Sequence, residues 1–400
     1  MDISHILIGA VTNRRISSVR ILLAVAALAL PLSWATPVKA QSADSDKAWA
    51  ELVSAAKKEG QLAVSISAIP DYNQVFDAFS KRFGIQVQAQ GGSSGPRVSR
   101  ILAERTANRY TVDVGILSVA AATRRMEPAE ALADFASLLI HPEVTDTSKW
   151  YGGQHWYPDI GKTKTIFVYS VRALSVWHFW YNTEKLSEQD VASLKTPRDF
   201  LDPKWKGMMA DRSQGDPSRL GGMLEAYFAP DAGPGWVRAY LTTMDVAYTN
   251  DMRLEETWLV RGRNPLKWAD GNLVDTLRDL SAKGLPIKVV HLPRAQGGLE
   301  ARSGECCITV LRDAPNPNAA KLFVNWFLSK EGQSLVHNIE PPRSYASLRE
   351  DIPPGNTAPE VRRVPGLTYS FRDFDPEYLA QQDKARDFIL DAFKEGQKKK

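Results

Sequence analysis

Hydrophobic and polar positions alternate between Ile85 and Gln90, where Ile85, Val87 and Ala89 are separated by glutamines. A period of two predicts a strand with one buried face. The polar run 91–95 ends this pattern, and Pro96 suits the first position of a helix because that position needs no N–H. The free N–H groups of such a helix start suit an anionic or strongly polar ligand. An ordinary capped strand-to-helix connection has the same pattern.

The neighbouring segments predict that this strand belongs to a parallel, doubly wound sheet. Helical spacing of apolar residues indicates helices over 49–59 and 72–83, and strands are expected over 62–67 and 112–117. Ligands of such sheets bind beyond the carboxyl ends of the strands. The residues predicted to meet there and bind ligand are Ser67, Ala68, Ser93, Ser94, Gly95 and Ser118.

A second region repeats the order of strand, polar loop and helix start. A buried strand over 207–210 is predicted to end at Asp211, Arg212 and Ser213, and Pro217 suits the first position of the next helix. The ligand-binding candidates here are Arg212, Ser213 and Ser218, because a guanidinium grips carboxylate or phosphate with two parallel hydrogen bonds. An exposed loop arginine is the alternative interpretation of Arg212.

An aromatic, strand-rich segment over 151–181 separates these two regions, and we interpret it as the crossover between two lobes. Its strands are expected over 166–169 and 176–181. Tyr169 is a further ligand-binding candidate because an aromatic ring stacks on a flat or cationic ligand. Packing at the junction of the lobes explains the same aromatic residues equally well.

Residues 1–40 are typical of an export signal. Arg14, Arg15 and Arg20 precede the apolar run 21–32, which is short for a membrane span, and small residues allow cleavage near Ala40. A retained anchor is the alternative. We therefore expect an exported protein, periplasmic in a Gram-negative source.

Charge and cysteine content narrow the class of protein. The chain has 50 basic and 46 acidic residues, and four of the basic and one of the acidic residues fall in 1–40, so the remainder has a net charge of +1. This balance does not favour a nucleic-acid partner. The two cysteines, Cys306 and Cys307, are adjacent, and because their eight-membered ring closes with difficulty we expect two buried thiols on a strand.

Motifs of enzymes are not found. The chain contains no Gly-x-Ser-x-Gly elbow, no His-Glu-x-x-His and no phosphate loop. Glu255 and Glu256 are adjacent on a predicted helix and so point apart, which does not suit paired acid–base catalysis. We expect a protein that is not an enzyme, and an exported hydrolase is the alternative from that class.

Several segments resemble type II periplasmic solute-binding proteins of bacterial ABC importers, in the branch that includes the ferric-ion binders. The segments are 49–60, 79–87, 104–105 with 112–114, 202–207, 314–323 and 328–333. The resemblance implies a two-lobed α/β fold, with a doubly wound mixed sheet flanked by helices in each lobe and a ligand cleft between the lobes. We expect lobe 1 over 41–170 and 293–345, and lobe 2 over 171–292 and 346–400 with a C-terminal helix.

The ferric members of that branch hold iron through two adjacent tyrosines, which by position fall near 265–270 here. No adjacent tyrosines occur in this chain, and the histidines after the export segment show no ligand spacing. We therefore expect no metal site of that type and no cofactor, although a metal held with a bound anion is not excluded. The resemblance also makes Arg263 and Trp268 a candidate wall of the ligand site.

The function that the sequence predicts is capture of a small polar or anionic solute by hinge closure, and its delivery to the membrane permease of an ABC importer. We expect the protein to act as a monomer. A protein that presents its ligand to a membrane sensor has the same design, and the sequence does not separate it from a transport protein.

Overall fold

The computed structural model describes residues 38–66, 69–92, 94–158, 164–215, 220–268, 271–301, 306–338, 345–355, 357–371 and 376–399. Residues 43–400 form one compact unit, separate from residues 1–42. Every contact given below lies within the larger unit. In the ranges that the structure describes, no helix has the length and apolarity needed to cross a membrane. Residues 1–37 of the predicted export segment lie outside these ranges.

The first sheet is mixed. Its strand order is β2-β1-β3-β10-β4. The strands are β1 (Gln61–Ser65), β2 (Gln86–Gln90), β3 (Val114–Leu117), β4 (Phe167–Val168) and β10 (Cys307–Val310). β1 pairs in parallel with both β2 and β3, whereas β10 runs antiparallel to β3 and β4. The three parallel strands therefore end at the same edge.

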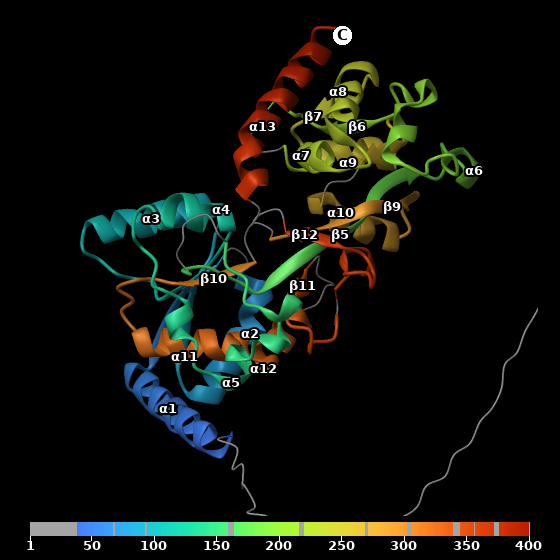
Figure 1. Ribbon diagram of the computed structural model, residues 1–400. Helices are drawn as coiled ribbons and strands as arrows, with labels where there is room; N and C mark the ends of the chain where they lie inside the picture. Colours follow the sequence, from blue (N-terminus) through green and yellow to red (C-terminus); the bar gives the residue numbers. More distant parts are fainter. Residues whose placement is uncertain are drawn as a thin grey trace, which may run out of the picture. The chain divides into compact units, whose positions relative to one another are not determined.

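Helices cover both faces of this sheet, and Figure 1 shows α3 on one side and α11 on the other. The helices of this part are α1 (Val38–Glu59), α2 (Ile69–Phe83), α3 (Ser94–Thr106), α4 (Val119–Ala121), α5 (Pro142–Thr145), α11 (Pro317–Leu328) and α12 (Lys330–His337). Apolar residues of these helices and strands form one continuous core, in which Phe79, Phe323 and Trp326 pack ring against ring. Leu348 belongs to this core as well.

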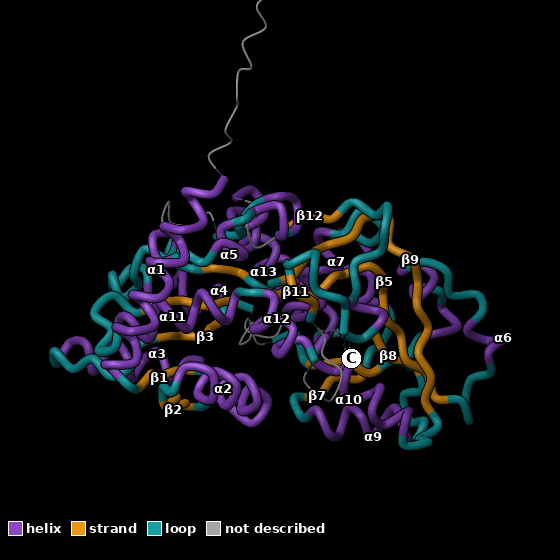
Figure 2. The backbone as a smooth tube through the Cα atoms, turned by 90° about the horizontal axis from the view of Figure 1, so that it is seen from below, coloured by secondary structure: helices purple, strands orange, loops and turns teal. Residues whose placement is uncertain are grey.

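A second sheet has the strand order β11-β5-β9-β12, and β8 also pairs with β5. Its strands are β5 (Ser170–Asn182), β8 (Leu266–Trp268), β9 (Ile287–Glu300), β11 (Ala346–Ser347) and β12 (Tyr369–Phe371), and β6 (Ala210–Arg212) pairs in parallel with β7 (Ala247–Thr249). Figures 1 and 2 both show β5 and β9 side by side, in the antiparallel register that pairs His178 with His291. The register shifts between Leu174 and Val176.

The helices around this sheet enclose a second core. They are α6 (Glu188–Val191), α7 (Gly221–Phe228), α8 (Gly233–Thr243), α9 (Met252–Val260), α10 (Gly271–Ala282) and α13 (Pro376–Gln397). The expected C-terminal helix is confirmed as α13, because Ala385, Ile389 and Ala392 are buried in this core. An α/β fold of mixed sheets flanked by helices is thus confirmed. The lobe boundaries that we drew from the sequence stay a prediction.

Helix α3 starts earlier than the sequence predicts. Ser94 is its first residue, so Pro96 stands third in the helix rather than first. Proline is tolerated throughout the first helical turn because the N–H groups there have no partner within the helix. Pro96 therefore stands third because the helix can start two residues before it. The other predicted helix opening, Pro217, lies outside the described residues, and α7 begins at Gly221.

Two of the segments that carry the family resemblance, 112–114 and 314–323, are tied together through Asp113. Its carboxylate accepts hydrogen bonds from the amide of Ala63 (2.7 Å) and from the amide and side chain of Asn316 (2.7 and 3.0 Å). Burial raises the pKa of Asp113. Because the side chain of Asn316 donates to Asp113, it does not cap α11. The carboxylate of Glu59 caps this helix by accepting from the amides of Asn318 (3.1 Å) and Ala319 (2.7 Å). These motifs serve the scaffold.

The expectation of two free thiols is wrong. Cys306 and Cys307 form a disulfide with each other where the chain enters β10, and both residues are fully buried. Free thiols are expected from the sequence because the eight-membered ring of two adjacent cysteines closes with difficulty. In the fold, the neighbouring backbone holds the segment in place, because the carbonyl of Cys306 accepts from the amide of Tyr169 (3.0 Å) and Cys307 pairs with both Leu117 and Val168.

Candidate functional site

One buried arginine gathers the ends of the three parallel strands in the first core. Arg97, in the first turn of α3, donates from Nη1 to Ser65 Oγ at the end of β1 (2.8 Å) and from Nε to the carbonyl of Gly92 after β2 (2.7 Å). Its Nη2 reaches the carbonyl of Ile116 on β3 at 3.5 Å. Three neighbouring strands thus meet around Arg97, which was not among the predicted site residues.

Burial and the charge of Arg100 lower the pKa of Arg97 to about 10. The group therefore stays protonated at neutral pH, so a positive charge lies beside the start of α3. Helix N-termini also favour negative charge because their first N–H groups point away from the helix. This edge of the first sheet is electrostatically suited to a polar or anionic ligand.

The structure places some of the first-lobe candidates, and others lie outside the described residues. Ser67, Ala68 and Ser93 belong to the latter group, and of Ser94 only the helical backbone is described. The carbonyl of Gly95 accepts from Ser99 Oγ and Arg125 Nη1, both at 3.0 Å. Ser118 Oγ accepts from the amide of Ala121 (3.1 Å) and so caps α4. Ligand binding by these residues stays a prediction.

Arg212 holds the corresponding position in the second core. It is the last residue of β6, and the amide of Ser213 continues the pairing by donating to the carbonyl of Thr249 (3.0 Å). Its guanidinium Nε and Nη2 atoms are shielded from solvent, and they have no hydrogen-bond acceptor among the described residues. A buried donor without an acceptor costs about 1–3 kcal/mol. The described residues do not offset this cost.

Charged residues behind β6 hold this strand in place. Asp211 accepts from the amide of Arg212 (2.7 Å) and from the hydroxyl of Tyr240 (3.4 Å). Lys267 Nζ contacts Glu255 and lies 3.9 Å from Asp211. Two carboxylates thus share one ammonium group behind this strand. Because neighbouring residues of a strand point to opposite faces, Arg212 faces away from Asp211.

The aromatic candidates pack inside the two cores. Tyr169 lies in the first, where its hydroxyl shares a hydrogen bond with that of Tyr72 (3.1 Å). Trp268 lies in the second and packs against Phe179 with ring centroids 4.3 Å apart. Arg263 is on an exposed turn and stacks over Trp258 at 4.5 Å. Arg263 and Trp268 thus have separate partners, and Ser218 lies outside the described residues.

A charged cluster on the ribbon of β5 and β9 was missed by the sequence analysis. Arg294 on β9 pairs with Glu225 of α7, and Arg172 on β5 lies 3.9 Å from the same carboxylate. The Arg294 guanidinium also stacks 3.7 Å from the ring centroid of Trp177. Both arginines are buried. The sequence does contain an indication of this cluster, because an arginine between apolar strand residues must find a partner when the strand is buried.

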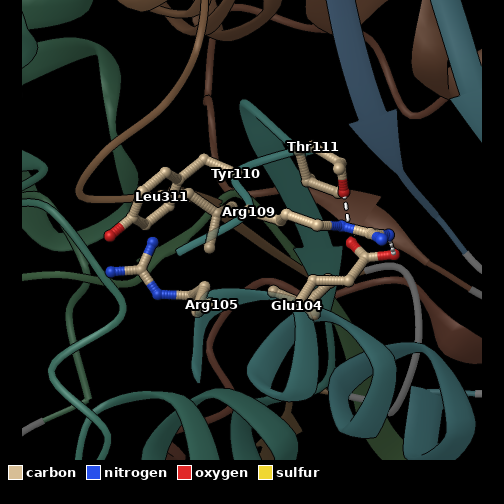
Figure 3. Close-up of a pocket in the computed structure, with 8 residues that line it drawn as sticks. Glu104, Arg105, Arg109, Tyr110, Thr111 and Leu311 are labelled. Carbon is tan, nitrogen blue, oxygen red and sulfur yellow. Dashed lines mark hydrogen bonds and ion pairs between the residues drawn. The ribbon is translucent and has the colours of Figure 1, made fainter. Parts of the chain in front are cut away.

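A small hollow lies at the opposite end of α3 from Arg97 (Figure 3). Glu104 accepts from the Thr111 hydroxyl there and lies 3.6 Å from Arg109. Figure 3 shows the Arg105 guanidinium beside the ring of Tyr110, and the centroid distance is 5.1 Å. These side chains pair with one another and join α3 to the segment before β3. The hollow is part of the scaffold.

A profile of the family described as bacterial extracellular solute-binding protein matches residues 74–361. The chain belongs to this family. Family members are binding proteins rather than enzymes, and they are exported from the cell. The solute-binding protein described here has, among its described residues, no group of three histidine, cysteine or acidic side chains placed to hold a metal ion.

Solved structures with the same fold include IdiA (FutA) from Trichodesmium in complex with iron and citrate. The two sequences are 19% identical and the TM-score is 0.56. The alignment covers 83% of this chain and 99% of the Trichodesmium chain. Another is the periplasmic binding protein AfuA from Actinobacillus pleuropneumoniae with fructose 6-phosphate bound, at 18% identity, a TM-score of 0.53 and coverages of 84% and 99%. Similarity at this level shows the fold alone.

An uncharacterised protein of Haemophilus influenzae is 28% identical over 179 residues, which are 44% of this chain. The match spans about half (49%) of the length of that relative.

Proposed function

We propose that this protein captures a small polar or anionic solute between two lobes and delivers it to the permease of an ABC importer. The observation that carries the proposal is the pair of strand-end sites, one at Arg97 in the first core and one at Arg212 in the second. Each presents a positive charge where a strand ends and the chain continues toward a helix. Two such sites suit the two ends of one polar molecule.

The ribbon of β5 and β9 supports hinge closure as the mechanism. These strands carry residues of both cores, since Val171 packs in the first and Phe179 in the second. The pairing is interrupted between Leu174 and Val176, and such an irregularity bends a strand locally. Closure needs only a few residues that absorb a change of backbone angle. A solute that contacts both lobes favours the closed form by the free energy of those extra contacts.

Anionic ligands occur on this fold. The Trichodesmium protein is described in complex with iron and citrate, and the Actinobacillus protein with fructose 6-phosphate. Citrate and sugar phosphate both carry negative charge, which the two guanidinium groups would complement. The proposal has further parts. The export signal is cleaved near Ala40, and the protein acts in the periplasm as a monomer. The lobes are bounded near residues 170, 292 and 345, and Ser94, Ser118 and Ser213 contact the ligand.

The proposal is tested by screening the purified protein against carboxylates, phosphonates, amino acids, polyamines and sugars in thermal unfolding. We expect one class to raise the melting temperature and to lower the radius of gyration in small-angle X-ray scattering, since closure makes the protein more compact. Cells that lack the protein should then lose uptake of that compound. Stabilisation without compaction would contradict hinge closure, and compaction with unchanged uptake would contradict delivery and favour presentation to a sensor.

A further inference from the structure

We propose that the solute carries a carboxylate or phosphate group, and that the Nε–Nη2 edge of Arg212 holds this group through two parallel hydrogen bonds. The inference rests on the proposed function and names the chemical class of the solute at that site. It starts from the two atoms of Arg212 that are shielded from solvent and lack an acceptor.

The geometry of a guanidinium explains why these two atoms matter together. The N–H bonds of Nε and Nη2 lie on one edge of the planar group and point in the same direction, so they match two oxygen atoms of one carboxylate or phosphate. Two orphaned atoms on that edge indicate one missing partner rather than two. A neutral hydroxyl would satisfy only one of them.

Another arginine of this protein, Arg349, has the same Nε–Nη2 edge bound to a carboxylate. Arg349 donates from Nε to Asp351 Oδ1 (2.9 Å) and from Nη2 to Asp351 Oδ2 (2.8 Å). Its Nη1 donates to the carbonyls of Glu143 and Leu328, both at 3.0 Å. Within the described part of the chain, no carboxylate takes the place at Arg212 that Asp351 takes at Arg349. An external anion would complete the arrangement.

The neighbouring acid does not fill the edge. Asp211 accepts from the backbone amide of Arg212, and its other oxygen accepts from Tyr240, on the opposite face of β6. The same carboxylate is close to Lys267. Asp211 therefore fixes the backbone of Arg212 and leaves the guanidinium edge available.

Gln214 narrows the class of ligand further. Its Nε2 donates to the carbonyl of Arg212 (2.8 Å), which fixes the orientation of the amide because the reverse orientation would place two acceptors together. The Oε1 atom is then left buried without a donor among the described residues, and Gln214 is only 4% exposed. A hydroxyl or amine next to the anionic group of the solute would supply that donor. A hydroxy acid, an amino acid and a phosphorylated polyol all satisfy both requirements.

The test measures affinities by titration calorimetry for matched pairs of compounds. Lactate is compared with propionate, and glycerol 3-phosphate with glycerol and inorganic phosphate, so the two sources of the anionic edge are separate arms. We expect at least one anion to bind the wild-type protein and Arg212→Gln to weaken it about tenfold or more, because a charged two-bond contact is lost. Arg212→Lys should be intermediate, since it keeps the charge and loses the parallel geometry.

Two further variants make the result specific. Arg198→Gln removes an exposed arginine near the second core and should leave the affinity for the anion unchanged. Gln214→Leu should reduce the preference for lactate over propionate while leaving propionate binding nearly unchanged. If Arg212→Gln does not fold, as judged by circular dichroism, the comparison rests on Arg212→Lys.

The outcomes separate the two proposals. If only neutral or cationic compounds bind, or if anions bind Arg212→Gln and Arg212→Lys as tightly as the wild type, the assignment of an anion to Arg212 is overturned and solute capture stands. If no compound in these pairs or in the wider screen binds the wild-type protein, both proposals are overturned.

Discussion

Arg349 and Arg212 both shield guanidinium nitrogen atoms from solvent, with opposite results for hydrogen bonding. Arg349 is fully buried near Trp150, and three of its nitrogen atoms reach Asp351 and two backbone carbonyls. Arg212 shields two nitrogen atoms that have no acceptor among the described residues. Among the described residues, the hydrogen bonds of the Arg349 guanidinium are thus completed, and those of Arg212 Nε and Nη2 are not. Removing one partner of a completed buried ion pair is costly, whereas a buried donor without an acceptor indicates a missing partner.

The largest effect is expected when the completed arginine is removed. Arg349→Gln leaves the carboxylate of Asp351 and the carbonyls of Glu143 and Leu328 without their donor. Breaking one side of a buried pair costs about 3–5 kcal/mol. The free energy of unfolding, measured by urea denaturation, should fall by that amount. A loss below about 1 kcal/mol would contradict a structural role, and Arg198→Gln serves as the surface control.

A second completed group, Asp113, should show a nearly equal loss. Asp113→Ala removes the acceptor of two backbone amides and of the Asn316 side chain. Hydrogen bonds to a charged group contribute about 1.5–3 kcal/mol each, so we expect a loss of about 3 kcal/mol in the same urea experiment. Unchanged stability would show that water replaces the carboxylate and that the motif is not essential to the scaffold.

The stability of Arg212→Gln without ligand distinguishes the two arginines most clearly. This substitution removes two unpaired N–H groups, so the free energy of unfolding without solute should stay the same or rise by about 1 kcal/mol. Residues arranged for binding are often suboptimal for stability. A fall of about 3 kcal/mol, as expected for Arg349→Gln, would place Arg212 among the structural arginines.

The smallest effect concerns pH. Burial raises the pKa of Asp113 in the folded protein above the usual value of 3.8. The folded state then binds the proton more tightly than the unfolded state, so this group makes the protein less stable as pH rises through the interval above 3.8. The stability of the wild type relative to Asp113→Asn should therefore decrease from about pH 4 upwards until the folded pKa is passed. A difference that grows with pH would contradict the direction of the shift.

The sequence predicts the first core well because its signals are local. Alternation at Val87 and Ala89 and the glycine at position 60 depend on neighbouring residues, and the structure contains the strand and the helix end that they indicate. The C-terminal helix was predictable for the same reason, through the spacing of Ala385 and Ile389. Periodicity reports which face is buried, and it is independent of distant parts of the chain.

The site was harder to predict because it depends on long-range contacts. Arg97 stands in a helical turn and gains its importance from its contacts with Ser65 at the end of β1 and with Gly92 after β2. Arg212 was predicted as a ligand group from its place after a strand, but only the structure shows which of its atoms lack partners. The disulfide between Cys306 and Cys307 is not predictable from the sequence, because the backbone that holds the two residues in place comes from distant strands.

A crystal structure of the protein with its bound solute tests the central claim most directly. The account predicts two oxygen atoms of one carboxylate or phosphate about 2.7–2.9 Å from Nε and Nη2 of Arg212, with a donor of the same molecule facing Gln214 Oε1. A solute bound elsewhere, with the Arg212 edge still empty, would contradict it.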